Sequence, residues 1–366
     1  FDFRYTFSGF RLELLHSNIK EPSHAGLFGL RTVFPLIPSI DMGFSVVTDL
    51  DQNSGLPDSD NDSFPDDWDD FPDDERLWSY YQSMINNLEE DFNCTGEQCS
   101  EGIQDIIADY SLLFDNHTMA LLPEDNMSGV AIDLTYKIND SIKLFSEFAQ
   151  LNGDTKNPDN DPDFNTNLGY GFIPIGLEAT FNSVKFTIDY RQSSENFIFH
   201  YWDKNYEHNR AIVTTVDDQK EAITKESLLY QFGKQKGGSL GFIANISKYL
   251  RFSVSYLYMR GDNWDSSIPE PDYVNDKNNS FYSKFEIDTS MIPKVEIAEI
   301  FYQQTNTKNP LKFEHNENTL FGYNIGISLA NNLALMLKGR KTYVYDSEAG
   351  NYTPVKNTHI ETSIYF

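Results

Sequence analysis

The chain has 366 residues and a formal net charge of −28, which argues against binding the polyanionic backbone of a nucleic acid. Its hydrophobic fraction is 39%, with no apolar run long enough for a transmembrane helix. An aromatic fraction of 14% is high for a water-soluble protein and leaves two classes to separate, a soluble β-sandwich and a protein that crosses a membrane with alternating strands.

Residues 1–16 predict strand. Phe3, Tyr5 and Phe7 share one phase of the alternation, whereas Leu12 and Leu14 share the other. The phase slips at Ser8-Gly9, so the stretch is either one long strand with a bulge or a tight hairpin.

The alternation then repeats to the end of the chain, through 26–48, 130–151, 173–191, 240–258, 281–303, 321–340 and 357–366. Every second connection is short, near residues 37, 140, 182, 248, 292 and 331. The intervening connections are long: 50–127, 152–167, 200–237, 261–279, 304–318 and 345–355. A soluble sandwich has no reason to keep short turns at one end and long loops at the other.

The last stretch carries a resemblance. Ile360, Thr362, Ile364 and Phe366 share one face up to the final residue. This resembles the closing strand of Gram-negative outer-membrane β-barrels, which commonly ends in Phe. The resemblance implies an all-β fold, an antiparallel transmembrane β-barrel over residues 1–366. It also implies a bacterial outer-membrane location, surrounding outer-membrane lipid, extracellular long loops, and barrel-assembly machinery as a partner during insertion. A single-chain barrel has an even strand number, so we interpret 1–16 as one bulged strand and expect about 14 strands.

The faces opposite the apolar residues would line the barrel lumen. They carry both signs of charge, which suits a water-filled or plugged channel. The predicted lumen residues are Arg31, Asp41, Asp133, Lys137, Glu178, Lys185, Asp189, Arg191, Arg251, Lys284, Glu286, Lys338 and Arg340.

An acidic stretch at 58–69 predicts a calcium site. Carboxylates spaced by two can converge on one hard cation, and the spacing resembles the EF-hand loop and the aspartate-rich repeats of thrombospondin type-3. Ser63 stands where that loop usually has Gly, and a solvated acidic loop is the alternative interpretation. The expected ligands are Asp58, Asp60, Asp62, the carbonyl of Phe64, Asp66 and Asp69.

Helical spacing follows at 74–92 and 100–114. Cys94 and Cys99 lie between these segments, where their small spacing and an extracytoplasmic location favour a local disulfide. Zinc would need more ligands than this stretch offers. We therefore expect the insertion at 50–127 to be a small folded extracellular cap with a helical part.

The sequence gives little support for catalysis. The seven His are scattered, and no nucleophile or phosphate-loop motif is present, so we expect no enzyme. His200 or His208 near Asp203 is a minor candidate at the barrel rim. The aromatic run 197–202 is interpreted as the outer aromatic girdle, because Tyr and Trp suit a membrane–water interface.

Two functions follow as expectations. The first is an outer-membrane channel for a small hydrophilic or amphipathic solute, gated by a calcium-stabilised cap. The alternative is a surface anchor or binding protein whose barrel mounts the cap for adhesion or complex assembly. That alternative involves a protein partner at the cap or in a domain upstream of Phe1.

Replacing Asp58 and Asp62 together with Ala should reduce calcium affinity and raise the protease sensitivity of residues 50–127, because two of the expected carboxylate ligands are lost. Isothermal titration calorimetry with CaCl₂ checks the affinity, and the heat-resistant gel mobility of the folded protein serves as the control. Absence of binding heat in the unmutated protein would leave only the solvated-loop interpretation.

Overall fold

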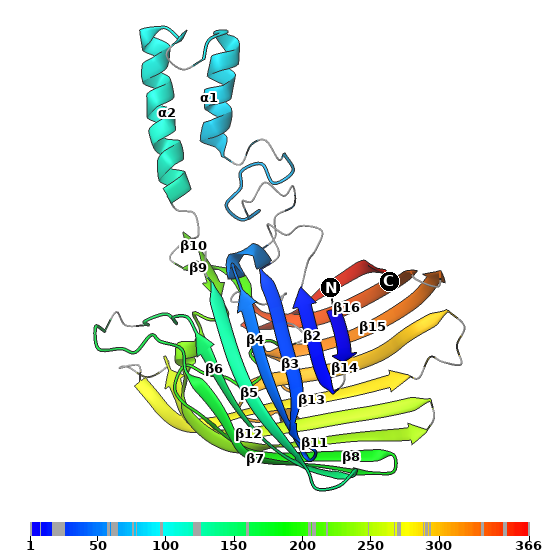
Figure 1. Cartoon of the computed structure of the whole chain (residues 1–366). Helices are drawn as coiled ribbons and strands as arrows, with labels where there is room; N and C mark the ends of the chain where they lie inside the picture. The colour runs from blue at the N-terminus through cyan, green and yellow to red at the C-terminus, as the bar shows by residue number, and fades with distance from the viewer. Residues whose placement is uncertain are drawn as a thin grey trace.

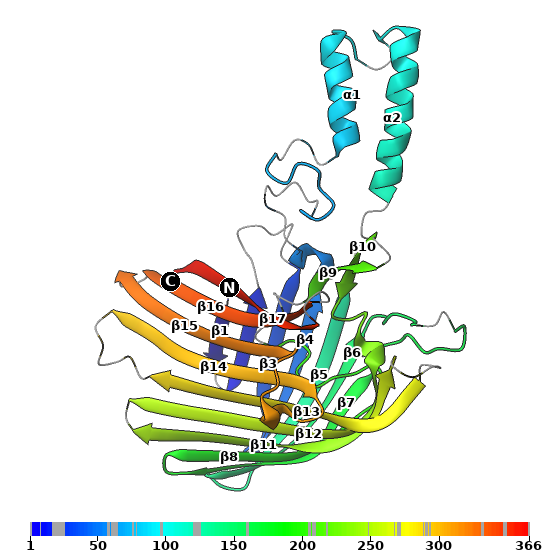
Figure 2. The ribbon, with the colours of Figure 1, turned by 180° about the vertical axis from the view of Figure 1, so that it is seen from behind.

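The protein is represented by a computed structural model, which describes residues 2–7, 9–16, 26–56, 59, 65–74, 77, 79–95, 98–119, 126–158, 161–203, 206, 210–216, 219–247, 249–266, 268, 272–287, 289, 292, 294–330, 333–346 and 350–364. In this part of the chain a 15-stranded antiparallel sheet dominates, in which neighbouring strands follow chain order (Figure 1). The sheet curls around an inner face in both views (Figures 1 and 2).

The sheet contains β1 (Asp2–Phe7), β2 (Phe10–His16), β3 (Leu27–Ile37), β4 (Ile40–Asp49), β5 (Met127–Lys137), β6 (Ile142–Asn152), β7 (Tyr170–Phe181), β8 (Val184–Ser193), β11 (Phe232–Ser247), β12 (Leu250–Asp265), β13 (Asp272–Ile287), β14 (Val295–Thr307), β15 (Thr319–Ala330), β16 (Leu333–Asp346) and β17 (Asn351–Ile364). A separate hairpin joins β9 (Ala211–Val216) to β10 (Gln219–Thr224). Because β8 pairs directly with β11, the residues between them leave the sheet.

The interpretation of residues 1–16 as one bulged strand is wrong. β1 and β2 form an antiparallel hairpin in which Phe7 pairs with Phe10. Gly9 in the turn has φ +91°, a conformation that glycine adopts without steric cost. The phase slip is therefore a chain reversal, and the described sheet has 15 strands where the sequence predicted about 14. Among the described residues β1 and β17 are not hydrogen-bonded to each other.

The predicted asymmetry of the connections is present. Short turns join β1 to β2, β3 to β4, β5 to β6, β7 to β8, β11 to β12 and β15 to β16. The connections from β4 to β5, β6 to β7, β8 to β11 and β14 to β15 are long, whereas only residues 347–350 separate β16 from β17. Asn182, in the turn between β7 and β8, has φ +50°, which asparagine tolerates better than most residues. Two predicted long loops, 261–279 and 345–355, are mostly strand. Ladder hydrogen bonds need no apolar side chains, so β12 and β13 stay paired through a polar stretch to Asp265 and Asp272.

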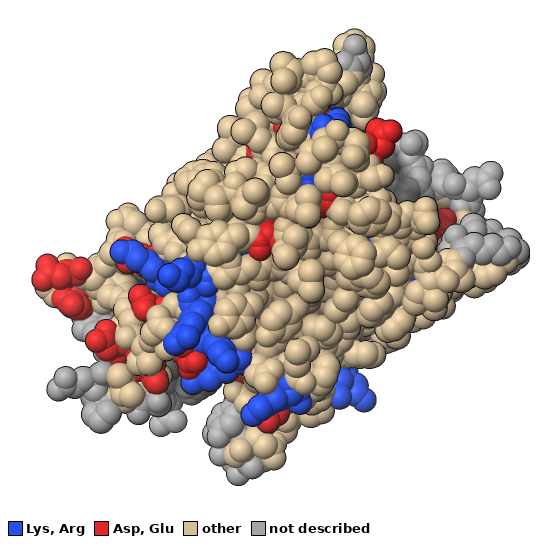
Figure 3. Space-filling view, turned by 90° about the horizontal axis from the view of Figure 1, so that it is seen from below, with Lys and Arg blue, Asp and Glu red and all other residues tan. Residues whose placement is uncertain are grey.

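The two faces of the sheet differ in chemistry. One face exposes large apolar side chains, such as Ile188 at 54% and Leu240 at 53%, which are register partners on β8 and β11. The surface seen from below is broad and nearly free of charge, with Lys and Arg gathered toward one side (Figure 3). The opposite phase of the strands forms the inner face and carries charged and small polar side chains, such as Asp189 of β8 and Ser239 of β11, which are also register partners.

The helices differ in extent from the predicted segments. α1 (Tyr80–Asp91) starts after the predicted residue 74, because Ser79 is the N-cap and its hydroxyl accepts a hydrogen bond from the Tyr81 N–H. α2 (Glu101–Met119) runs beyond the predicted end at 114. The two lie side by side and stand away from the sheet in both views (Figures 1 and 2). Within the described residues, neither helix is long and apolar enough to cross a membrane.

Cys94 and Cys99 form the expected disulfide between α1 and α2. Replacing both with Ser should destabilise the helical hairpin by about 2 kcal/mol, because the short loop gains freedom in the unfolded state. Limited proteolysis of residues 80–119 with and without reductant checks this. The sheet, which the disulfide does not link, should keep its unfolding temperature; a matching loss there would contradict the local role.

Candidate functional site

The segment between β8 and β11, residues 194–231, is called the inserted segment below; its described residues 197–202 pack onto the inner face of the sheet. Phe197 and Tyr201 are 4% and 2% exposed and pack with Leu27, Met127 and Leu151 from β3, β5 and β6. The expectation that 197–202 forms an outer aromatic girdle is therefore wrong. The run is rich in aromatic residues because it is buried inside the curled sheet. Exposure to lipid would select the same residues, so the sequence alone cannot distinguish the two locations.

Two glycines allow this close approach. A Cβ atom on Gly129 of β5 would lie 2.4 Å from the ring of Trp202, and one on Gly171 of β7 would lie 2.3 Å from the ring of Phe197. Any larger residue at either position would push the aromatic ring off the strand. The inserted segment is thus fitted to bare backbone on the inner wall.

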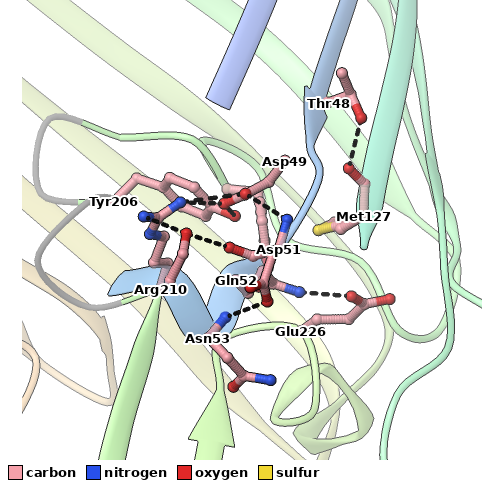
Figure 4. Close-up of polar contacts among 11 residues, drawn as sticks. Thr48, Asp49, Asp51, Gln52, Asn53, Met127, Tyr206, Arg210 and Glu226 are labelled. Carbon is pink, nitrogen blue, oxygen red and sulfur yellow. Dashed lines mark hydrogen bonds and ion pairs between the residues drawn. The ribbon is translucent and has the colours of Figure 1, made fainter. Parts of the chain in front are cut away.

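A buried ion pair fixes the inserted segment to the end of β4 (Figure 4). The carboxylate of Asp49 is fully buried and accepts hydrogen bonds from the Tyr206 hydroxyl at 2.9 Å and from Arg210 Nη1 at 3.1 Å. Arg210 Nη2 also donates to Ser54 Oγ at 2.9 Å. Burial, together with the adjacent Asp49 charge, raises the pKa of Tyr206, so this hydroxyl stays protonated and donates.

A second buried contact lies beside this pair (Figure 4). Gln52 Nε2 donates to Glu226 Oε2 at 2.7 Å, and the Tyr201 hydroxyl donates to Gln52 Oε1 at 2.9 Å. Gln52 belongs to η1 (Gln52–Gly55), which begins where the Asp51 side chain accepts from the Asn53 N–H. The start of the long 50–126 connection is therefore locked to the inserted segment rather than to the helical hairpin.

The inserted segment also reaches other walls of the curled sheet. Gln303 of β14 donates to Asp203 Oδ2 at 3.0 Å, and the Arg191 guanidinium of β8 lies 4.9 Å from the centroid of the Phe199 ring. Lys225 Nζ donates to the Tyr201 carbonyl at 2.5 Å and lies 3.8 Å from Asp203 Oδ1. The segment consequently spans the interior from β3–β6 to β14.

Two hollows flank this arrangement along the inner face of β11–β14. One of about 490 Å³ lies under the inserted segment and is lined by Arg191, His200, Asp203 and Lys225, together with Phe199 and Trp202. The other, of about 440 Å³, lies near the short turns and is lined by Arg251, Glu286 and Glu296. Small residues (Gly241, Ser253 and Ser255) share the inner phase of β11 and β12 between them.

In the first hollow, the pKa values of His200 and Lys225 are lowered, which favours the neutral form of each side chain. The imidazole of His200 is accessible from the hollow, yet burial among protein atoms and the Arg191 charge lower its pKa to about 4. Its backbone has φ +63°, an uncommon conformation for a residue with a side chain. Burial lowers the pKa of Lys225, opposed by the Asp203 carboxylate. The chemistry offered is a mixed polar and aromatic surface suited to an amphipathic molecule.

Most of the residues predicted for the lumen lie in ion pairs on the inner face. Arg31 Nη1 lies 2.8 Å from Asp133, Lys137 Nζ 2.6 Å from Asp41, Lys185 Nζ 2.6 Å from Glu178, and Arg191 Nε 2.6 Å from Asp189. Lys284 Nζ contacts both Glu286 at 2.7 Å and Glu299 at 2.9 Å. Arg340 donates to backbone carbonyls and lies over the Phe301 ring, Lys338 pairs in register with Asn324, and Arg251 lines the second hollow.

Of the six expected calcium ligands, only Asp66 and Asp69 lie among the described residues. Asp58, Asp60, Asp62 and Phe64 lie outside the described residues, as does His208. Asp66 accepts hydrogen bonds from the backbone N–H and the hydroxyl of Ser59, both at 2.7 Å, and Asp69 accepts from the Phe71 N–H at 2.7 Å. Within the described part of the chain no group of three or more His, Cys, Asp or Glu side chains is placed to hold a metal ion. The calcium site stays a prediction.

Sequence reasoning missed the polar network around Asp49. Its partners Tyr206 and Arg210 lie 157 and 161 residues further along the chain. No local spacing joins such residues. The one available signal was an aspartate at the end of an otherwise regular strand.

No protein-family model matches the chain, and no curated protein matches it. Among solved structures, it is similar to the FrpB iron transporter from Neisseria meningitidis at 13% identity, covering 96% of this chain and 47% of that one, with a TM-score of 0.32. The toluene transporter TbuX from Ralstonia pickettii gives 8% identity, coverage of 100% and 80%, and a TM-score of 0.32. A mutant Rh. blastica porin gives 7% identity, coverage of 97% and 89%, and a TM-score of 0.32.

The chain spans about half the length of the FrpB transporter, at 47%. At these scores the likenesses settle neither the family nor the function of the chain.

His200 should titrate well below an ordinary histidine, because burial and Arg191 both disfavour its charged form. The unfolded chain takes up this proton near pH 6.5 and the folded chain only near pH 4, so the stability contributed by neutral His200 is complete above pH 6.5 and falls as the pH drops toward 4. Histidine-selective NMR titration checks the pKa. Arg191→Gln should raise it; an unchanged value would contradict the assigned cause.

Proposed function

We propose that the chain forms a β-barrel in a bacterial outer membrane and conducts a small amphipathic solute. The observation that carries this proposal is the opposition of the two sheet faces: apolar side chains exposed on one, ion pairs and small polar side chains on the other. An exposed apolar face of this extent is stable against lipid and unfavourable against water. We also propose that the sheet closes into a barrel and that the long connections face the outside of the cell.

The proposed path runs along the inner face of β11–β14, between the hollow under the inserted segment and the hollow near the short turns. Gly241, Ser253 and Ser255 leave room there because their side chains are small. Asp189 with Arg191, and Lys284 with Glu299, offer both charges along the way without a net field of either sign. Such lining favours solutes that are polar at one end and apolar or aromatic at the other.

In this proposal the gate is the inserted segment 194–231 rather than the helical cap. The segment crosses the interior, whereas α1 and α2 stand away from the sheet (Figure 1). Opening requires the contacts of Asp49, Gln52 and Gln303 with the segment to loosen. Each is a polar contact that a charged or hydrogen-bonding solute can replace.

We further propose that the acidic stretch 58–69 binds calcium and stabilises the base of the helical hairpin. Support comes from the ligand spacing and from Asp66, whose bonds to Ser59 bring the two ends of this stretch together. Asp58, Asp60, Asp62, Asp66 and Asp69 would supply carboxylate oxygens and Phe64 a carbonyl oxygen.

One observation favours the alternative of a surface anchor. The helical hairpin exposes Ile106 and Leu112, the latter at 61%, although it packs on no part of the described sheet in either view. Exposed apolar side chains on a projecting element suit a protein partner. In that case the barrel would serve as the mount.

Ile188→Arg should hinder membrane insertion, whereas Thr187→Arg should not. Ile188 lies on the apolar outer face and Thr187, its neighbour, lines the inner hollow. An arginine facing the bilayer midplane costs about 2–4 kcal/mol. Folding into liposomes, followed by heat-modifiable gel mobility, compares the two variants. Equal behaviour would contradict the assignment of the outer face.

Single-channel recording in a planar bilayer tests conduction. The unmutated protein should give discrete conductance steps, and Asp49→Asn should open more often. Removing that carboxylate charge leaves Arg210 buried without its counter-ion, which costs about 3–5 kcal/mol and loosens the gate.

The matched control is Asp163→Asn, which removes one carboxylate charge from an exposed position in the connection between β6 and β7. It should conduct like the unmutated protein. If the unmutated protein and the Asp49→Asn variant are both folded and inserted but give no conductance steps, the channel proposal is rejected. The surface-anchor alternative would then remain.

A further inference from the structure

Three cations lie in one row across the outer face of the sheet. The strand register pairs Lys236 of β11 with Arg260 of β12, and Arg260 with Lys277 of β13. All three side chains are exposed. Neighbouring strands lie about 5 Å apart, so the row spans roughly 10 Å.

The row does not serve the stability of the folded chain. Like charges placed directly opposite on neighbouring strands repel each other and destabilise the pairing. No ion pair joins these three residues to a described carboxylate. The acidic residues of the same stretch have other contacts: Asp276 pairs with Lys308 at 2.5 Å, and Asp262 accepts from Asn275. An arrangement that costs stability points to a ligand of opposite charge.

The position of the row identifies the kind of ligand. On the same face, Tyr258 of β12 lies two residues from Arg260 and is 40% exposed. Tyr190 of β8, 39% exposed, is the register partner of Gly238, which lies two residues from Lys236 on β11. Beyond them lie Ile188 and Leu240, both more than half exposed. Counted from the row toward the middle of the sheet, this face of β8, β11 and β12 therefore presents cations, then tyrosines, then aliphatic side chains, while β12 and β13 continue beyond the row to Asp265 and Asp272. This is the order of polar headgroup, interface and hydrocarbon in a lipid leaflet.

We propose that Lys236, Arg260 and Lys277 form a binding site for the phosphate-bearing headgroup of an anionic lipid, whose acyl chains lie on the apolar face below. The site rests on the proposed function, because only a chain that spans a membrane presents this face to lipid. Arginine holds phosphate in bidentate fashion, and the two lysines supply point charges on either side. Arg260 keeps its orientation because its Nε donates to Asn275 Oδ1 at 3.0 Å.

The test compares the unmutated protein with a triple variant, Lys236→Gln, Arg260→Gln and Lys277→Gln. The control triple variant, Lys156→Gln, Lys308→Gln and Lys312→Gln, loses the same charge from exposed lysines that already have acidic partners in Glu221, Asp276 and Glu314. Native mass spectrometry from detergent measures bound phosphatidylglycerol against phosphatidylcholine of the same acyl chains.

The unmutated protein and the control should retain phosphatidylglycerol at least about tenfold better than phosphatidylcholine, as three cations near an anionic surface imply. The row variant should lose most of that preference. Equal retention of the two lipids by the unmutated protein would overturn the site. So would displacement of the lipid by millimolar inorganic pyrophosphate alone, which would assign the row to a soluble phosphate.

Flotation with phosphatidylcholine liposomes separates this inference from the proposed function. Protein that floats but shows no lipid preference refutes only the headgroup site. Protein that does not float with any liposome refutes the membrane assignment and the lipid site with it.

Discussion

The geometry of the β-strand is the constraint on which the rest of the molecule depends. Successive side chains must point to opposite faces, so a sequence that alternates apolar and polar residues produces a sheet with one face of each kind. Backbone hydrogen bonds between neighbouring strands satisfy the polar main chain within the sheet, although among the described residues β1 and β17 do not pair with each other. A sheet that is apolar on the outside, and closed as proposed above, is the kind of structure that hydrocarbon can surround.

Curling such a sheet creates an interior that must be filled with water, side chains or inserted chain. Here the inserted segment occupies it. The buried pair of Asp49 with Arg210 is expensive to desolvate, and an apolar contact of the same volume would hold the segment at least as firmly. Unlike an apolar contact, the polar contact between Asp49 and Arg210 can be replaced by contacts with a polar solute. In the proposed channel, this property suits the segment to act as the gate.

Charge is arranged differently on each surface. Inside, acids and bases alternate between neighbouring strands and neutralise each other, as with Glu178 between Lys143 and Lys185. Outside, Lys236, Arg260 and Lys277 stand together at the margin of the apolar face. The excess of acid in the whole chain therefore says little about either surface, because much of it lies in the connections.

The sequence by itself determined the all-β class, the short turns at one end of the strands, the helical pair and its disulfide. Each of these depends on local periodicity or on residues close in the chain. It did not determine the hairpin at Ser8-Gly9, because a bulge and a reversal produce the same slip of phase.

Only the tertiary structure decided where the 197–202 aromatics lie and what holds them. Burial inside the sheet and exposure to lipid select the same apolar residues, so composition cannot distinguish them. The contacts of Asp49 with Tyr206 and Arg210 join residues more than 150 positions apart, at separations of 157 and 161. Such contacts exist only once the sheet has curled and the segment has folded into it.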